Sequence, residues 1–286
     1  MLASFSIQIT DGDDMTSATV HTGSDLLRQC VVAASTVVAI VGSFIGTGAA
    51  GGTPIQDAAG GALATDATPI APGGAAFGIW SVIYLGLIAY AIWQFLPAQR
   101  SDPRQRLLGY PIAASLILNA VWIFSIQFDL LPLSVPVIVL LLAVLVHTFR
   151  LTIVTRPRTL VEALVADGTV GLYLGWVCVA TAANITAWLV TTGFDGFGLD
   201  SDAWAVGVIA VAGLAGVLLA FRGRGRLGPA ISLSWGLAWV AVARVTGDLV
   251  SPPAAAAALV AVLAVIGFTV ALRLMTPTLS ASVVTA

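Results

Sequence analysis

Long apolar segments alternate with short polar segments along most of the chain. A helix needs about 20 apolar residues to cross a bilayer, and eight segments are of about that length. Several contain Gly, Pro, Ser or Asn, which spanning helices tolerate because neighbouring helices satisfy the freed backbone groups. The pattern predicts an all-α polytopic membrane helix bundle with eight transmembrane helices, near residues 30–48, 76–96, 107–128, 131–150, 168–190, 203–221, 228–247 and 252–274.

The positions of arginine between these segments provide an independent test of the number of transmembrane helices. Alternate connections carry arginine, and the remaining ones carry aspartate instead. A missed or invented helix would break this alternation. Basic residues collect on the cytoplasmic side of a membrane, so we expect a cell-membrane protein with both termini in the cytoplasm. The eleven arginines on the expected cytoplasmic side are Arg28, Arg100, Arg104, Arg106, Arg150, Arg156, Arg158, Arg222, Arg224, Arg226 and Arg273.

Composition excludes several classes of protein. Only 9% of the residues are charged and 58% are hydrophobic, whereas soluble domains carry about 25% charged residues, so the expected partner is the lipid bilayer. Basic clusters typical of nucleic-acid binding are missing. Cys30 and Cys178 show neither metal-ligand nor disulfide spacing. The sequence assigns no metal ligand and no catalytic residue, and it leaves open whether the protein is an enzyme.

Three motifs occur in order along the second, third and fifth segments. Residues 77–84 read FGIWSVIY, residues 118–122 read LNAVW, and residues 173–181 read YLGWVCVAT. In order and spacing they resemble the tryptophan-rich sensory protein family, also called TspO/MBR or translocator protein. The similarity covers about residues 30–190. It implies a five-helix membrane domain over 30–190, flanked by a polar, disordered tail over 1–29 (starting at Met1 or Met15) and a three-helix membrane extension over 191–286.

The resemblance also implies a ligand and a partner. Members of the family bind tetrapyrroles and other flat hydrophobic molecules between the helices, so we expect a non-covalent porphyrin or haem-like ligand and a homodimer. The motifs carry the family's cavity residues onto this chain, and Tyr173 joins them because it shares a helical face with Trp176. The expected ligand-binding residues are Trp80, Tyr84, Asn119, Trp122, Tyr173, Trp176 and Ala180.

Other interpretations stay open for several of these residues. Trp and Tyr also form belts at membrane interfaces, and buried amides can join helices by hydrogen bonds. Asn119 fits a ligand role and a helix-joining role equally, whereas Asn184 fits the second better. Arg244 lies within the seventh segment, four residues before Asp248, a spacing that suits an ion pair across one helical turn.

The connection at 49–75 departs from the family, because it contains neither Lys nor aromatic residues. It is either a flexible linker or a lid over a pocket. The leading hypothesis is a membrane receptor or carrier for a hydrophobic small molecule such as a porphyrin. The alternatives are a secondary transporter of a small hydrophobic solute and an intramembrane porphyrin-degrading enzyme. The first six segments show no ionisable residue deep inside, which counts against ion coupling.

Overall fold

The computed structural model describes residues 13–49 and 51–275, with side chains from residue 23 onward. This part of the chain is helical and contains eight helical segments that are long and apolar enough to span a membrane, which confirms the predicted all-α bundle. The long helices are α1 (Asp13–Gly46), α2 (Ile79–Trp93), α4 (Pro103–Gln127), α5 (Leu131–Val154), α7 (Thr169–Thr191), α8 (Ser201–Arg222), α9 (Leu227–Thr246) and α10 (Pro252–Met275).

Shorter helical turns connect the long helices. They are η1 (Ala59–Gly61), η2 (Gly74–Gly78), α3 (Pro97–Arg100), α6 (Leu160–Glu162), the π-helical turn η3 (Ala163–Gly168) and η4 (Gly196–Gly198). The fifth span is a composite, because α6, η3 and α7 run on without a break from Leu160 to Thr191. It begins eight residues earlier than the apolar pattern predicts (160 against 168).

Helix α1 differs from the sequence expectation at its start. Residues 13–29 belong to this helix rather than to a polar tail, and residues 1–12 lie outside the described residues. Asp25 and Arg28 are buried, and Asp25 accepts two hydrogen bonds from Arg106 of α4, at 2.8 and 2.7 Å. Asp25, which the apolar pattern leaves outside the first span, is therefore partnered by a neighbouring helix, and apolar periodicity cannot reveal this contact.

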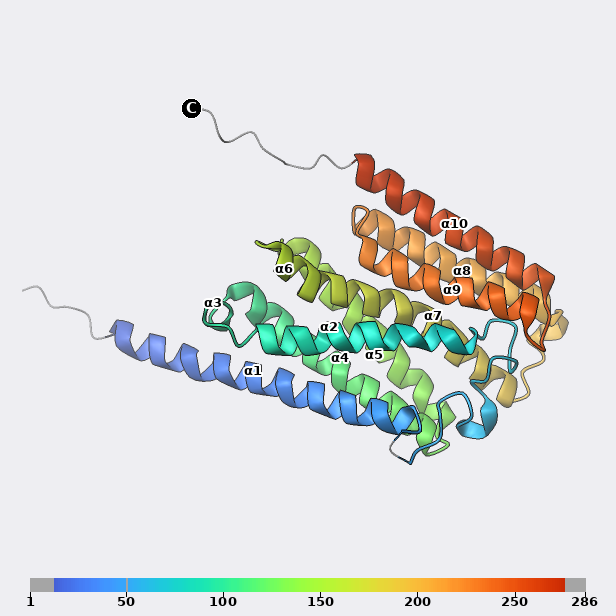
Figure 1. Cartoon of the computed structure of the whole chain (residues 1–286), viewed down its shortest axis with the longest axis horizontal. Coiled ribbons are helices and arrows are strands. Elements are labelled where there is room, and N and C mark those ends of the chain that lie inside the picture. The colour runs from blue at the N-terminus through green and yellow to red at the C-terminus, as the bar shows by residue number, and fades with distance from the viewer. Residues whose placement is uncertain (1–12, 50, 276–286) are drawn as a thin grey trace, which may run out of the picture.

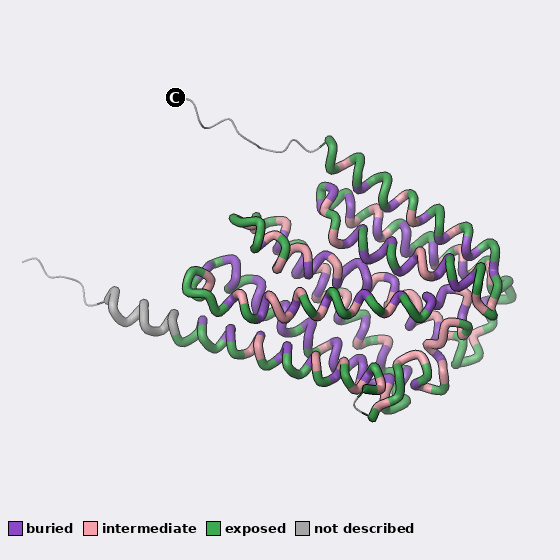
Figure 2. The backbone as a smooth tube through the Cα atoms, in the orientation of Figure 1, coloured by how far each residue is buried: buried purple, intermediate pink, exposed green. Residues whose placement is uncertain are grey.

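Two groups of helices share α7. Helices α1, α2, α4, α5 and α7 surround one cluster of buried apolar side chains, and α8, α9 and α10 surround a second cluster that also includes Val179 of α7. Figure 1 shows α8, α9 and α10 side by side along one edge of the molecule, with α1 at the opposite edge. The buried residues lie between the helices, and exposed residues run along their outer sides (Figure 2).

Helix α9 packs closely on α7, whereas α8 packs mainly on α10. The close contact requires glycine at position 175, because a Cβ there would lie 2.2 Å from the carbonyl oxygen of Pro229. The outer surface suits lipid: Leu85 of α2 is 67% exposed and Leu263 of α10 is 71% exposed.

Candidate functional site

A small aromatic cavity lies where the loop between α1 and α2 covers the ends of α2, α4, α5 and α7. Its enclosed volume is about 40 Å³, which is enough for a very few water molecules. The helices contribute Phe77, Trp80, Asn119, Trp122, Ile138, Leu141, Trp176, Val177, Ala180, Ala183, Asn184 and Ala187, and the loop contributes Ala62, Leu63, Thr68, Ala71 and Pro72.

Aromatic rings from α2 and α7 meet at this cavity. The Trp176 ring lies 5.6 Å from Phe77 and 6.3 Å from Trp80, both with edge-to-face geometry. Trp80 also stacks on Tyr84 at 5.3 Å. Such pairs add about 0.5–1.5 kcal/mol beyond the burial of their area, so the rings hold one another in fixed orientations. Trp176 is 1% exposed and Trp122 is 7% exposed, so neither belongs to an interfacial belt.

Two polar atoms on the cavity wall have no hydrogen-bond partner among the described residues. They are Oδ1 of Asn119, an acceptor, and Nε1 of Trp176, a donor. The amide nitrogen of Asn119 donates to the hydroxyl of Tyr84 at 2.6 Å. A buried group without a partner costs about 1–3 kcal/mol. The cavity wall therefore has one hydrogen-bond acceptor and one hydrogen-bond donor without a partner.

Asn184 joins three helices. Its Oδ1 accepts from Nε1 of Trp122 at 2.9 Å, and its amide nitrogen donates to the Ser134 hydroxyl at 2.9 Å. These bonds connect α7 to α4 and α5, as expected for an amide that joins helices. They also orient Trp122 at the cavity.

The seven residues expected at the ligand site divide into two groups. Trp80, Asn119, Trp122, Trp176 and Ala180 line the cavity, whereas Tyr84 and Tyr173 lie behind this layer and support it. Tyr84 stacks on Trp80, and Tyr173 packs edge-on against Trp80 at 5.6 Å and donates to the Ser115 carbonyl oxygen at 3.2 Å. The expected ligand-binding residues did not include Phe77, although its spacing places it on one helical face with Trp80 and Tyr84.

The sequence left the 49–75 connection open as a linker or a lid, and the structure places part of it over the cavity. Residues 62–73, which we call the strap, cross the cavity with small and apolar side chains. Arg244 of α9 holds the strap: its Nη1 donates to the Thr68 carbonyl oxygen at 3.0 Å, and its Nη2 donates to that of Thr65. Arg244 is fully buried. The expected pair with Asp248 is wrong, because Arg244 turns to the strap carbonyl oxygens while Asp248 is exposed.

Two tryptophans of α9 also contact this region. The carbonyl oxygen of Trp239 accepts from the Gly73 N–H at 3.2 Å, and Trp235 Nε1 donates to the Ala76 carbonyl oxygen at 2.9 Å. Neither side chain lines the cavity. Helix α9 therefore fixes the strap and the start of α2 from outside.

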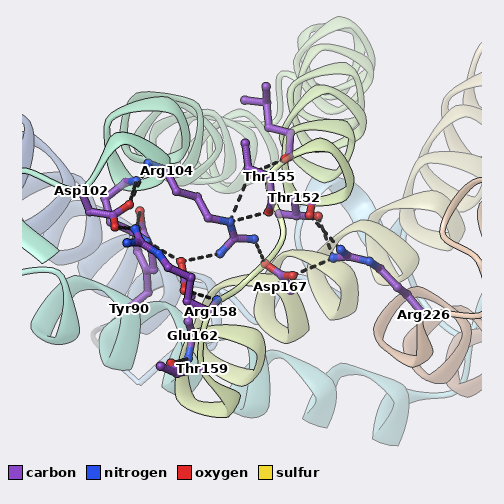
Figure 3. Close-up of polar contacts among 12 residues, drawn as sticks. Tyr90, Asp102, Arg104, Thr152, Thr155, Arg158, Thr159, Glu162, Asp167 and Arg226 are labelled. Atoms are coloured by element: carbon purple, nitrogen blue, oxygen red, sulfur yellow. Dashed lines mark hydrogen bonds and ion pairs between the residues drawn. The ribbon is translucent and has the colours of Figure 1, made fainter. Parts of the chain in front are cut away.

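A buried ionic network lies at the opposite ends of these helices (Figure 3). Arg104 at the start of α4 forms ion pairs with Glu162 of α6, at 2.8 Å, and with Asp167 of η3. The second oxygen of Asp167 accepts from Arg226, which precedes α9, also at 2.8 Å. Glu162 and Asp167 lie inside the composite fifth span and pair with arginines that are distant in sequence.

The fold and the site define a polytopic all-α membrane protein with an aromatic cavity closed by a loop. The chain belongs to the TSPO-like protein family, because the model of that family matches residues 32–271. This confirms the resemblance read from the motifs. Neither the curated proteins nor the solved structures include a match to this chain.

The family match extends beyond the resemblance read from the sequence. The three motifs cover about residues 30–190, whereas the family model continues through α8 and α9 and almost to the end of α10. The three C-terminal helices are thus matched together with the five helices that form the cavity.

Proposed function

We propose that the protein binds a flat hydrophobic molecule of the porphyrin class in the aromatic cavity and acts as its membrane receptor or carrier. One observation carries the proposal: the cavity wall combines tryptophan rings from α2, α4 and α7 with one unpartnered acceptor, Asn119 Oδ1, and one unpartnered donor, Trp176 Nε1. Ligand sites typically combine apolar and aromatic walls with a few convergent polar groups.

A porphyrin supplies groups that complement this wall. Its ring plane offers faces to the indoles of Trp80, Trp122 and Trp176. Of the carboxyl groups at its edge, a protonated one can donate to Asn119 and an ionised one can accept from Trp176. At about 40 Å³ the cavity is far smaller than such a ligand. Binding therefore requires the strap to move outward, since the strap forms one wall of the cavity.

The same proposal includes an orientation in the membrane. The arginines of the ionic network, Arg104 and Arg226, lie at the helix ends opposite the strap (Figures 1 and 3). The positive-inside rule assigns such ends to the cytoplasm. The strap and the aromatic cavity then belong to the outer half of the cell membrane, with both termini in the cytoplasm.

The test is a titration of the purified full-length chain with protoporphyrin IX, followed by tryptophan fluorescence quenching. Trp176→Phe removes the unpartnered N–H and keeps a ring. We expect about a three- to tenfold loss of affinity, the value of one hydrogen bond. The double variant Trp80→Ala, Trp176→Ala should lose saturable binding.

Trp93→Phe is the matched control, because Trp93 lies at the other end of α2, away from the cavity. Its affinity should equal that of the wild type. Unchanged affinity in both cavity variants, or no saturable quenching of the wild type, would contradict the proposal.

One observation favours the alternative hypothesis of a secondary transporter. Arg104, Glu162 and Asp167 are charged groups buried within segments that span the membrane, and intramembrane ionisable residues often couple ions. Proton-driven accumulation of protoporphyrin in liposomes, abolished by Asp167→Asn, would support transport. Equal uptake with and without a proton gradient would exclude that coupling.

A further inference from the structure

A second and much larger apolar space lies between α7 and α8. Its volume is about 780 Å³, against about 40 Å³ for the aromatic cavity, and it falls in the range of about 300–1,000 Å³ that is usual for ligand pockets. We call it the groove. Its walls come from α7, from α8 between Ser201 and Ala215 and from the loop between the two helices, with Leu142 of α5 and two strap residues completing it.

The groove exists because α8 diverges from α7. Helix α9 occupies one face of α7, and α8 packs on α10 instead of closing the gap. Val190 on α7 and Val211 on α8 border the groove and are 52% and 68% exposed. Both helices are membrane spans, so the groove opens sideways to lipid. A molecule dissolved in the bilayer reaches it without passing through water.

The groove has features of a binding site beyond its apolar walls. Thr181, which is only 7% exposed, lines the groove, and its buried hydroxyl has no hydrogen-bond partner among the described residues. Trp204 and Phe194 form an edge-to-face pair at 5.6 Å on the same wall, and Trp204 Nε1 donates to the Gly196 carbonyl oxygen at 2.6 Å. An aromatic surface and one free hydroxyl suit a flat apolar molecule with few polar groups.

The strap separates the groove from the aromatic cavity. Thr68, Ala71 and Pro72 face the cavity, whereas Pro69 and Ile70 between them face the groove. Helix α7 is shared in the same way, since Ala183 lines the cavity and Ala182 lines the groove. A displacement of this short segment would therefore join the two spaces across the end of α7.

We propose that the groove is the lateral entrance through which a flat, bilayer-dissolved apolar ligand reaches the aromatic cavity, with the strap as the gate and Arg244 as the residue that holds it closed. This inference rests on the proposed function. It assigns a task to the C-terminal helices: α8 forms a wall of the entrance, and α9 supplies Arg244.

The hydrogen bonds of the strap set the barrier to opening. Arg244 binds two strap carbonyl oxygens, those of Thr65 and Thr68, and a guanidinium does this with two separate N–H groups. The compact ammonium of a lysine cannot reproduce that two-pronged geometry. Arg244→Lys keeps the charge and should weaken the closed state.

The test measures association and dissociation of protoporphyrin IX by stopped-flow quenching, with the full-length protein in phosphatidylcholine vesicles. Gly207 lines the groove, and a Cβ there meets no atom within 4 Å, so the side chain of Gly207→Phe begins in open space and its ring obstructs the groove. Gly267 on α10 is equally open but lies outside the groove. Gly267→Phe is therefore the matched control.

An obstruction on the path raises the barrier for entry and exit alike and leaves the end states unchanged. For Gly207→Phe both rate constants should fall by about tenfold while Kd stays the same, and Gly267→Phe should behave as wild type. For Arg244→Lys association should become faster. Saturable binding with equal rates in Gly207→Phe and Gly267→Phe would overturn the entrance alone, as would a changed Kd in Gly207→Phe with an unchanged association rate. Lack of saturable binding in the wild type would instead overturn the proposed function.

Discussion

At the scale of single residues, the sequence could place a side chain in the site only where a recognisable motif contains that residue. Trp80, Asn119, Trp122 and Trp176 could be assigned to a common space because their motifs carry helical spacing and a family resemblance. Arg244 could not be placed, because its partners are backbone carbonyl oxygens 176 and 179 residues away. Every residue has a backbone carbonyl group, so the sequence cannot single one out as the partner of Arg244. The nearby Asp248 instead suggested an ion pair that the fold does not form.

Asp167 provides a residue-scale prediction about stability. Its two oxygens accept from Arg104 and Arg226, so Asp167→Asn leaves Arg226 without its counter-charge and buried Arg104 with Glu162 as its remaining carboxylate partner. We expect a loss of about 3 kcal/mol in the free energy of unfolding, as is usual when one partner of a buried ion pair is removed. Equilibrium unfolding in detergent micelles measures it.

Arg158→Gln is the comparison for that variant. Arg158 pairs with Asp102, whose side chain is 4% exposed, but the Arg158 side chain itself is 66% exposed. Solvent therefore screens the pair, and we expect a smaller loss of about 1 kcal/mol. Equal losses in the two variants would show that burial does not set the strength of this network.

At the scale of elements, apolar runs and arginine alternation predicted all eight spans, because lipid imposes length and polarity on each helix. The ends were less predictable. Helix α1 extends back to Asp13 and the fifth span back to Leu160. Asp25 in the first extension and Asp167 in the second form ion pairs with arginines of other segments, and an apolar pattern does not show such pairs. The apolar pattern also did not predict the packing of α9 on α7, because this packing depends on glycines that periodicity does not single out.

Gly175 provides the prediction at this scale. The Cβ of Gly175→Ala would lie 2.2 Å from the Pro229 carbonyl oxygen and 2.3 Å from the Ser232 hydroxyl, so α9 must shift. We expect a loss of about 1–3 kcal/mol, the usual cost of overpacking, seen as a lower midpoint of thermal unfolding. Gly207→Ala is the control: its Cβ meets open space, and the midpoint should stay or rise because alanine favours a helix. Unchanged stability in Gly175→Ala would contradict the close contact.

At the scale of the whole molecule, the C-terminal helices act on both ends of the cavity-forming bundle. Arg244 of α9 holds the strap at one end, and Arg226, just before α9, joins the ionic network at the other. The sequence suggested a five-helix unit with an added extension. The contacts connect these two parts at both ends of α9, and the family match covers both. Such long-range connections arise only when the chain is folded.

The most direct test of the ligand site is an experimental structure of the full-length protein with protoporphyrin IX. The macrocycle should lie between Trp80, Trp122 and Trp176, within hydrogen-bonding distance of Asn119 Oδ1 and Trp176 Nε1, with the strap displaced outward. A macrocycle found only outside that space, with the three rings packed as in the unliganded protein, would contradict the account.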